Sequence, residues 1–222
     1  ALALFDRAAG RRLSQPLHLA LSYDEEVGCL GVRRLIEMMA ALPVRPEVCI
    51  VGEPTSMQVV TAHEGKTALR AECHGVECHS SLAPQGLNAI HMASDLLTGL
   101  RRIQKRLSDE GAHDGAYDVP WTTIHAGVIQ GGEALNIVPN RASFDFEIRY
   151  LPEDDEHAIV ARIRAAAEEI ANTYRDVHAP ARFEFAELQS YPAMNTPVDS
   201  EAVKFVHALT GGNSTGKITF GT

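Results

Sequence analysis

The chain has 222 residues, a size between one large domain and two small ones. Hydrophobic residues make up 45% and charged residues 22%, which is typical of a globular protein and excludes collagen-like and low-complexity chains. Its 20 lysines and arginines stand against 29 aspartates and glutamates, and the net charge of −9 argues against nucleic acid or an anionic membrane as a partner. No apolar run approaches the roughly 20 residues that a membrane-spanning helix needs.

The first part of the chain predicts a strand–helix–strand unit. Residues 1–12 are typical of the end of a helix that stops at Gly10. Apolar residues then alternate over 17–22, a helical stripe follows over 32–41, and 48–51 is a continuous apolar run. Such a run is typical of a strand buried on both faces. We therefore expect a parallel pair of strands with a right-handed crossover.

The middle of the chain predicts a different module, a ferredoxin-like βαββαβ domain. Its strands and helices are expected, in order, over residues 67–73, 87–107, 121–129, 142–150, 154–174 and 182–188. A helix over 198–209 and a strand over 217–220 follow. The predicted fold class is thus α/β, with residues 66–187 inserted into a second domain made of residues 1–65 and 188–222.

The four cysteines, Cys29, Cys49, Cys73 and Cys78, predict free thiols rather than disulfides. No secretory signal accompanies them, and buried free thiols are typical of a reducing cytosol, so we expect a cytoplasmic protein. Two of the cysteines precede histidines, but their spacing is not that of a zinc knuckle.

Acidic residues follow both predicted parallel strands. Asp24, Glu25 and Glu26 come after the first strand, and Glu53 comes after the second. Ligands of open α/β sheets bind outside the carboxyl ends of the strands, where these side chains would converge. Each acid alone could be a solvated loop residue, but carboxylates packed together repel one another unless a cation neutralises them. A divalent metal with a carboxylate free to accept a proton would use such a cluster.

Five motifs in this order resemble the acetylornithine deacetylase, aminoacylase and succinyl-diaminopimelate desuccinylase family of co-catalytic zinc metallohydrolases. They are Ser22-Tyr23-Asp24-Glu25-Glu26-Val27-Gly28, Val51-Gly52-Glu53-Pro54-Thr55, His79-Ser80-Ser81-Leu82-Ala83-Pro84, Gly131-Gly132-Glu133-Ala134-Leu135-Asn136-Ile137-Val138-Pro139 and Phe146-Glu147-Ile148-Arg149. The resemblance covers nearly the whole chain. Gly-Glu-Pro-Thr followed by His63-Glu64-Gly65-Lys66 looks most like the acetylornithine deacetylase branch, an activity of arginine biosynthesis.

The resemblance implies a role for each matching residue of the catalytic domain. Glu25 matches the general base that activates the attacking water. Glu26 matches a ligand of one metal ion, and Glu53 a ligand of the other. Two zinc ions are expected per complete active site, with cobalt possible.

The resemblance also implies that residues 66–187 form a lid that joins two subunits in a homodimer. His79 matches a histidine that reaches the partner's active site and stabilises the oxyanion. Asn136 and Arg149 match residues that hold the substrate, and Gly221 and Thr222 match a loop lining its pocket. The residues by themselves also allow His79 as a helix cap, Asn136 as a turn residue and Arg149 as a solvated strand residue.

The implied reaction is hydrolysis of the amide bond of an N-acyl amino acid, most closely N-acetylornithine. The family's His-x-Asp motif, bridging aspartate and late histidine are missing from the 222 residues. We therefore expect an internal piece of a longer enzyme that binds zinc weakly and is inactive by itself. The alternatives are a dimerisation module without activity, or a desuccinylase, aminoacylase or dipeptidase of the same family.

Overall fold

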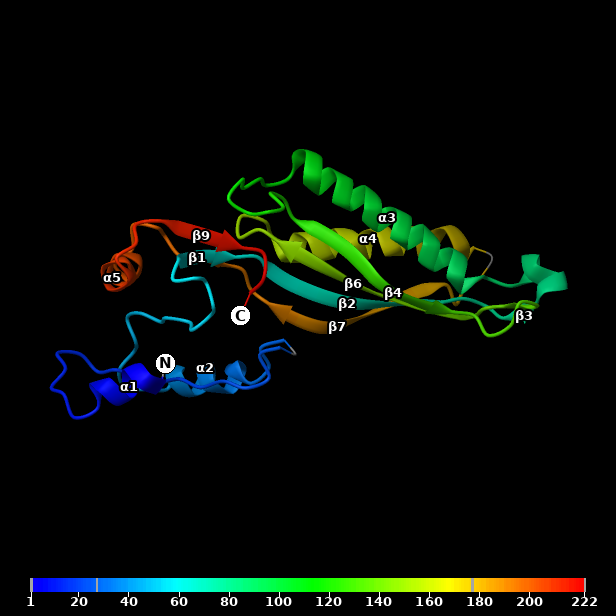
Figure 1. The fold of residues 1–222 in the computed structure, drawn as a ribbon. Coiled ribbons are helices and arrows are strands. Elements are labelled where there is room, and N and C mark those ends of the chain that lie inside the picture. The colour runs from blue at the N-terminus through cyan, green and yellow to red at the C-terminus, as the bar shows by residue number, and fades with distance from the viewer. Residues whose placement is uncertain (1, 27, 177, 222) are drawn as a thin grey trace. The chain divides into compact units, whose positions relative to one another are not determined.

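The computed structural model describes residues 2–26, 28–176 and 178–221, which divide into two compact units (Figure 1). The first unit holds the chain up to Val59 together with Pro197–Thr215. The second holds Val60–Thr196 with Gly216–Gly221.

The second unit is built on a four-stranded antiparallel sheet in the order β4-β6-β2-β7. Its strands and helices, in chain order, are β2 (Gly65–His74), α3 (Ala89–Glu110), β4 (Thr123–Gly131), β6 (Arg141–Tyr150), α4 (Glu156–Arg175) and β7 (Arg182–Tyr191). Both helices cover the same face of the sheet (Figure 1). This βαββαβ arrangement confirms the predicted ferredoxin-like module and the α/β class.

Local sequence explains why the two helices form and which side they bury. The Asn88 side chain accepts hydrogen bonds from the first turn of α3, and Asp155 does the same for α4. Each helix then carries apolar residues three or four apart. Those buried against the sheet are Met92, Ala93, Leu96, Leu100, Ile103 and Leu107 on α3, and Ile159, Ile163, Ala167 and Ala171 on α4. They pack on the alternate residues of β2 and β6 that point the same way, Leu69, Ala71, Cys73, Phe144, Phe146 and Ile148.

The other face of the sheet is charged, and neither α3 nor α4 covers it. Arg70 lies opposite Asp145 and donates two hydrogen bonds to its carboxylate, at 2.7 and 2.8 Å. Lys66 pairs with Glu147 at 3.1 Å in the same strand pair. The alternation of strand side chains thus separates an apolar core from an ionic surface, as it should in a half-covered sheet.

Short elements continue both ends of this sheet. At one end, β3 (Cys78–His79) pairs with β5 (Ile137–Val138), and a 3₁₀-helix, η1 (Ser80–Gln85), follows β3. At the other end, a small sheet has the order β8-β1-β9. Its strands are β1 (Val59–His63), β8 (Met194–Asn195) and β9 (Thr215–Ile218).

The first unit contains the helices α1 (Leu2–Ala8), α2 (Val32–Ala40) and α5 (Glu201–Thr210). The strands predicted over 17–22 and 48–51 are wrong, because the structure has no strand in either segment. Their apolar side chains are exposed, Leu21 by 67% and Ile50 by 56%. A strand needs backbone partners and a covered face, and no neighbouring strand pairs with these segments in the described part of the chain.

Two further findings concern the cysteines and the helices. All four cysteines are free, but only Cys73 is buried and Cys49 is exposed, so the expected burial of the thiols holds for one of them. None of the helices in the described ranges is both long and apolar enough to cross a membrane.

Candidate functional site

The acidic residues of the first unit lie in a tight loop and around one thiol. The Glu25 carbonyl accepts hydrogen bonds from the backbone N–H groups of Gly28 and Cys29, at 3.0 and 2.9 Å. The Cys29 thiol donates to the Glu25 carboxylate at 3.8 Å. Burial, and after it the charges of Glu25 and Glu53, raise the pKa of Cys29. Glu25 and Glu53 therefore approach the same side chain from two separate segments, while Glu26 is exposed.

These carboxylates do not make a complete metal centre. Within residues 2–26, 28–176 and 178–221, no three histidine, cysteine, aspartate or glutamate side chains are grouped so that they could hold a metal ion. A zinc ion in a protein takes three or four such ligands. The described residues therefore offer part of a coordination shell and do not by themselves fit a zinc ion.

His79 lies at the end of β3 and caps η1. Its Nδ1 accepts a hydrogen bond from the backbone N–H of Ser81 at 3.2 Å and lies 2.8 Å from the Ser81 hydroxyl. Because Nδ1 is an acceptor here, a neutral ring carries its hydrogen on Nε2. The capping role that the residues alone allowed is thus present, and it leaves an Nε2–H donor on an exposed side chain.

Asn136 lies beside His79. Its carbonyl oxygen accepts a hydrogen bond from the backbone N–H of Ser80 at 2.8 Å, and the next residue, Ile137, is the β-ladder partner of His79. The side chain of Asn136 is exposed and sits in the turn that precedes β5. The structure therefore brings two of the predicted site residues together at one end of the second unit.

Arg149 and Gly221 meet at the opposite end, through Tyr191. The Arg149 Nη1 donates to the Tyr191 hydroxyl at 3.0 Å, and the Gly221 N–H donates to the same oxygen at 3.4 Å. The Arg149 Nε donates to the Glu147 carboxylate at 3.1 Å. Thr222, predicted to line the same pocket, lies outside the described residues.

This end also contains three residues to which the sequence motifs assign no role, Tyr191, His63 and Glu64. The His63 ring packs edge-on against Tyr191 with centroids 6.2 Å apart, and its Nδ1 donates to the Glu64 carbonyl at 2.9 Å. Glu64 is only 3% exposed, and burial raises its pKa from 4.5 to about 7 against the opposing charge of Arg149. Glu64 stands within a motif of the predicted family, but only its contacts reveal its burial.

The two groups are far apart within one chain. Gly75 follows β2, and its backbone N–H donates to the carbonyl of Asn140, which precedes β6. The end of the unit that contains His79 therefore lies next to Arg141, the first residue of β6. Arg149 is at the other end of β6, on the order of 30 Å away at about 3.4 Å per residue. Figure 1 shows β3 and the β1–β9 sheet at opposite ends of the four long strands. His79 and Arg149 of one chain therefore cannot contact the same small molecule.

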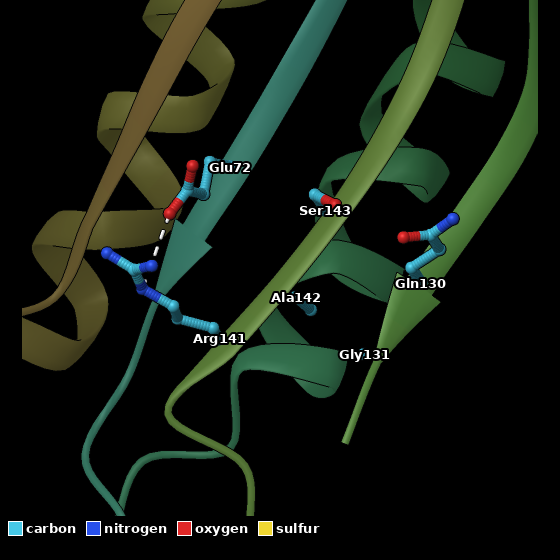
Figure 2. A pocket seen from close by; sticks show the side chains of 6 residues that line it. All are labelled: Glu72, Gln130, Gly131, Arg141, Ala142 and Ser143. Carbon is cyan, nitrogen blue, oxygen red and sulfur yellow. Dashed lines mark ion pairs between the residues drawn. The ribbon is translucent and has the colours of Figure 1, made fainter. Parts of the chain in front are cut away.

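A hollow on the ionic face contains none of these residues. It has a volume of about 270 Å³ and is lined by Glu72, Gln130, Gly131, Arg141, Ala142 and Ser143 (Figure 2). Its polar side chains face one another across β2, β4 and β6, and Glu72 and Arg141 form an ion pair at 3.4 Å. It is an open depression of the sheet surface and is not the site that the motifs predict.

The model of the peptidase dimerisation domain of the M20 family matches residues 61–175. The acetylornithine deacetylase of Myxococcus xanthus is 32% identical over 222 residues, which are the whole of this chain and 56% of that protein. That of Shigella sonnei is 30% identical over 201 residues, 90% of this chain and 50% of that protein. The chain thus spans about half the length of these relatives.

Solved structures show the same fold. The aminopeptidase PepT of Bacillus cereus aligns with a TM-score of 0.65 and 21% identity, over 90% of this chain and 49% of its own. The match of the dimerisation domain covers more than half of the chain and lies on the ferredoxin-like unit that the structure shows. The resemblance found in the motifs is thereby confirmed, and the chain belongs to the M20 peptidase family.

Proposed function

We propose that the protein is part of a metal-dependent hydrolase that cleaves the amide bond of an N-acyl amino acid, with N-acetylornithine as the substrate. The reason for this substrate is the similarity to acetylornithine deacetylases along the whole chain. Zinc is the proposed metal, with cobalt as the alternative, and the proposed enzyme is a cytoplasmic homodimer. Residues 66–187 act as its lid, and residues 1–65 and 188–222 belong to its catalytic domain.

The observation that carries the proposal is the separation of His79 and Asn136 from Arg149 and Gly221. The motifs assign all four residues to one active site, yet a rigid sheet on the order of 30 Å long stands between the two pairs. A two-fold dimer resolves this, because the tip of each lid then reaches the base of the other subunit. Each complete site contains residues of both chains.

The edge of the sheet offers a surface for this dimer. β4 is an edge strand, and its residues from His125 to Gly131 are all exposed. Val128 and Ile129 are apolar members of this segment and are each at least half exposed. An exposed strand edge with apolar side chains is suited to pair with a second copy of itself.

The chemistry proposed for the site residues is the one that the family resemblance implies for them. Glu25 takes the proton of the attacking water and passes it to the leaving amine. The Nε2–H of the partner's His79 donates to the oxyanion, while Arg149 binds the substrate carboxylate. Glu26 would hold one metal ion and Glu53 the other, together with ligands that the described residues do not supply, and a bound metal would polarise the acyl carbonyl.

Mixed dimers test the proposal. In the metal-loaded enzyme, His79→Ala and Arg149→Met each inactivate the homodimer. When the two variants are unfolded and refolded together, half of the dimers are mixed, and each mixed dimer has one site with both residues intact. We expect about a quarter of the parent activity. If both residues serve a site in their own chain, every site stays defective, and the mixture remains as inactive as its components.

The second candidate, a dimerisation module without activity, is favoured by the lack of a three-ligand group among the described residues. Equilibrium dialysis of the 222-residue chain with zinc tests whether this chain completes a metal site by itself. We expect binding far weaker than that of a complete zinc centre and no hydrolysis of N-acetylornithine. Stoichiometric tight binding of two zinc ions would show that the chain completes the site by itself.

A further inference from the structure

We propose that Tyr191 is a positioning residue, which holds the Arg149 guanidinium and the Gly221 turn so that Arg149 binds the substrate α-carboxylate. The inference rests on the proposed function, because it takes Arg149 as the carboxylate ligand. Tyr191 lies in none of the sequence motifs. With its help, one end of the Arg149 guanidinium would bind the carboxylate of the N-acyl amino acid.

The hydrogen bonds of Tyr191 support this role. A phenolic oxygen has two acceptor positions and one hydrogen to donate. The acceptor positions receive the Arg149 Nη1–H at 3.0 Å and the Gly221 N–H at 3.4 Å. The bond from the charged guanidinium is the shorter and therefore the stronger of the two. Tyr191 thus joins β6 to the segment that follows β9.

The guanidinium of Arg149 is held at two of its three nitrogens. Nη1 is bound to Tyr191, and Nε donates to Glu147, whose carboxylate is itself paired with Lys66 at 3.1 Å. In the described residues, Nη2 has no hydrogen-bond partner. One hydrogen of Nη1 and both hydrogens of Nη2 are therefore free to donate. They lie at the end of the guanidinium, where Nη1 and Nη2 together can bind both oxygens of a carboxylate. Because both anchors fix the plane of the fork, little rotamer freedom remains to be lost on binding.

The packing around Tyr191 explains why residue 221 is a glycine. A Cβ at that position would come within 2.5 Å of the Tyr191 ring and 2.8 Å of the His63 ring. No side chain fits there, so the backbone of residue 221 can approach the tyrosine closely enough to donate its N–H. The tyrosine backbone is fixed as well, because its carbonyl accepts a hydrogen bond from the Tyr150 hydroxyl at 3.3 Å.

The test removes the hydroxyl and keeps the ring, as Tyr191→Phe in the metal-loaded enzyme. Two substrates are compared: N-acetylornithine, and N-acetylputrescine, which lacks only the α-carboxylate. We expect KM for N-acetylornithine to rise roughly tenfold, as for loss of a hydrogen bond to a charged group, with kcat little changed. The kcat/KM for N-acetylputrescine should not change. Tyr174→Phe is the matched control, because it makes the same chemical change at a hydroxyl that donates to Asp95 and has no contact with Arg149 or Tyr191, and it should behave like the parent.

Arg149→Met separates the inference from the function on which it rests. If Arg149→Met abolishes the preference for the carboxylated substrate and Tyr191→Phe keeps it, the role of Tyr191 is refuted while the proposed function stands. If Tyr191→Phe lowers kcat/KM equally for both substrates and lowers the melting temperature, the tyrosine is only structural and the inference is wrong. If Arg149→Met keeps the preference, or the enzyme cleaves neither substrate, the proposed function fails and the inference falls with it.

Discussion

Replacing Glu64 with glutamine should make the protein more stable at neutral and alkaline pH. Glu64 is 3% exposed and lies between β1 and β2. The charged and titratable groups that act on it are Arg149, which favours its ionised form, and Tyr117, whose own pKa it helps to raise. Burial outweighs the arginine and raises the carboxyl pKa from 4.5 to about 7. The neutral acid is therefore the form that the fold prefers, and glutamine has its shape.

The size of the effect follows from the two pKa values. The unfolded chain loses the proton near pH 4.5, whereas the folded chain keeps it until about pH 7. Between these values the folded state binds more protons, so the free energy of unfolding falls as pH rises and levels off above pH 7. The shift corresponds to a loss of about 3 kcal/mol. The glutamine of Glu64→Gln has no proton to lose. The free energy of unfolding of this variant should therefore exceed that of the parent by about that amount at pH 8 and equal it near pH 4.5.

Urea unfolding of the 222-residue chain at several pH values measures this difference. Glu77→Gln is the matched control, because it makes the same chemical change at an exposed position and should keep the parent's pH dependence. A Glu64→Gln variant with the same decline between pH 4.5 and pH 7 as the parent would show that the decline has another source. A variant less stable than the parent at pH 8 would show that the ionised carboxylate is stabilised by Arg149 more than burial opposes it.

Three further predictions concern the core, the loop before β4 and the chemistry. Phe144→Ala removes a ring that is 1% exposed and should lower the free energy of unfolding, measured in urea, by about 3–5 kcal/mol. Val128→Ala, at an exposed position, should change it little. Lys217→Met removes the ion pair that lowers the pKa of Asp114. The free energy of unfolding should fall by about 1 kcal/mol at pH 7. The parent and the variant should become equally stable in acid, because Asp114 is then protonated and the ion pair is lost in both. Glu25→Gln in the metal-loaded enzyme should lower kcat by at least about a hundredfold while metal content by atomic emission stays the same; an unchanged kcat removes the base role from Glu25.

The ferredoxin-like unit could be predicted because its signals are local. The stripe on α3 and the alternation on β6 are visible in any window of ten residues, and each matches the face that the structure buries. The boundaries shifted only by a few residues. Asn88, for example, is the N-cap of α3, so the helix begins two residues after its predicted start.

The strands over 17–22 and 48–51 failed for the opposite reason. Their apolar patterns record a preference for an extended backbone, but a parallel strand forms only with hydrogen-bonded neighbours on its sides and cover on its faces. A sequence pattern shows the need for these partners and cannot show that they are present. The segments therefore stay unpaired in the described structure, with Leu21 and Ile50 exposed.

The base of the candidate site was only partly predictable. Arg149 and Gly221 stand in motifs, but the residue that joins them, Tyr191, is 42 positions from the first. A contact of this kind depends on the register of β2 with both β6 and β7. The buried Glu64 is a similar case, because a glutamate in a polar segment looks solvated until its neighbours in space are known.

The sheet between the two ends has a role beyond stability. If His79 of one chain and Arg149 of another form one site, the distance between them depends on the register of β2 against β6 in each chain. A slip of one residue would move the tip by about 3.4 Å and would turn the core residues toward water. Arg70 and Asp145 lie directly opposite each other and are joined by two parallel hydrogen bonds, a geometry that only one register allows. An exposed ion pair of this kind contributes at most about 1 kcal/mol to stability, so fixing the register is its more important effect.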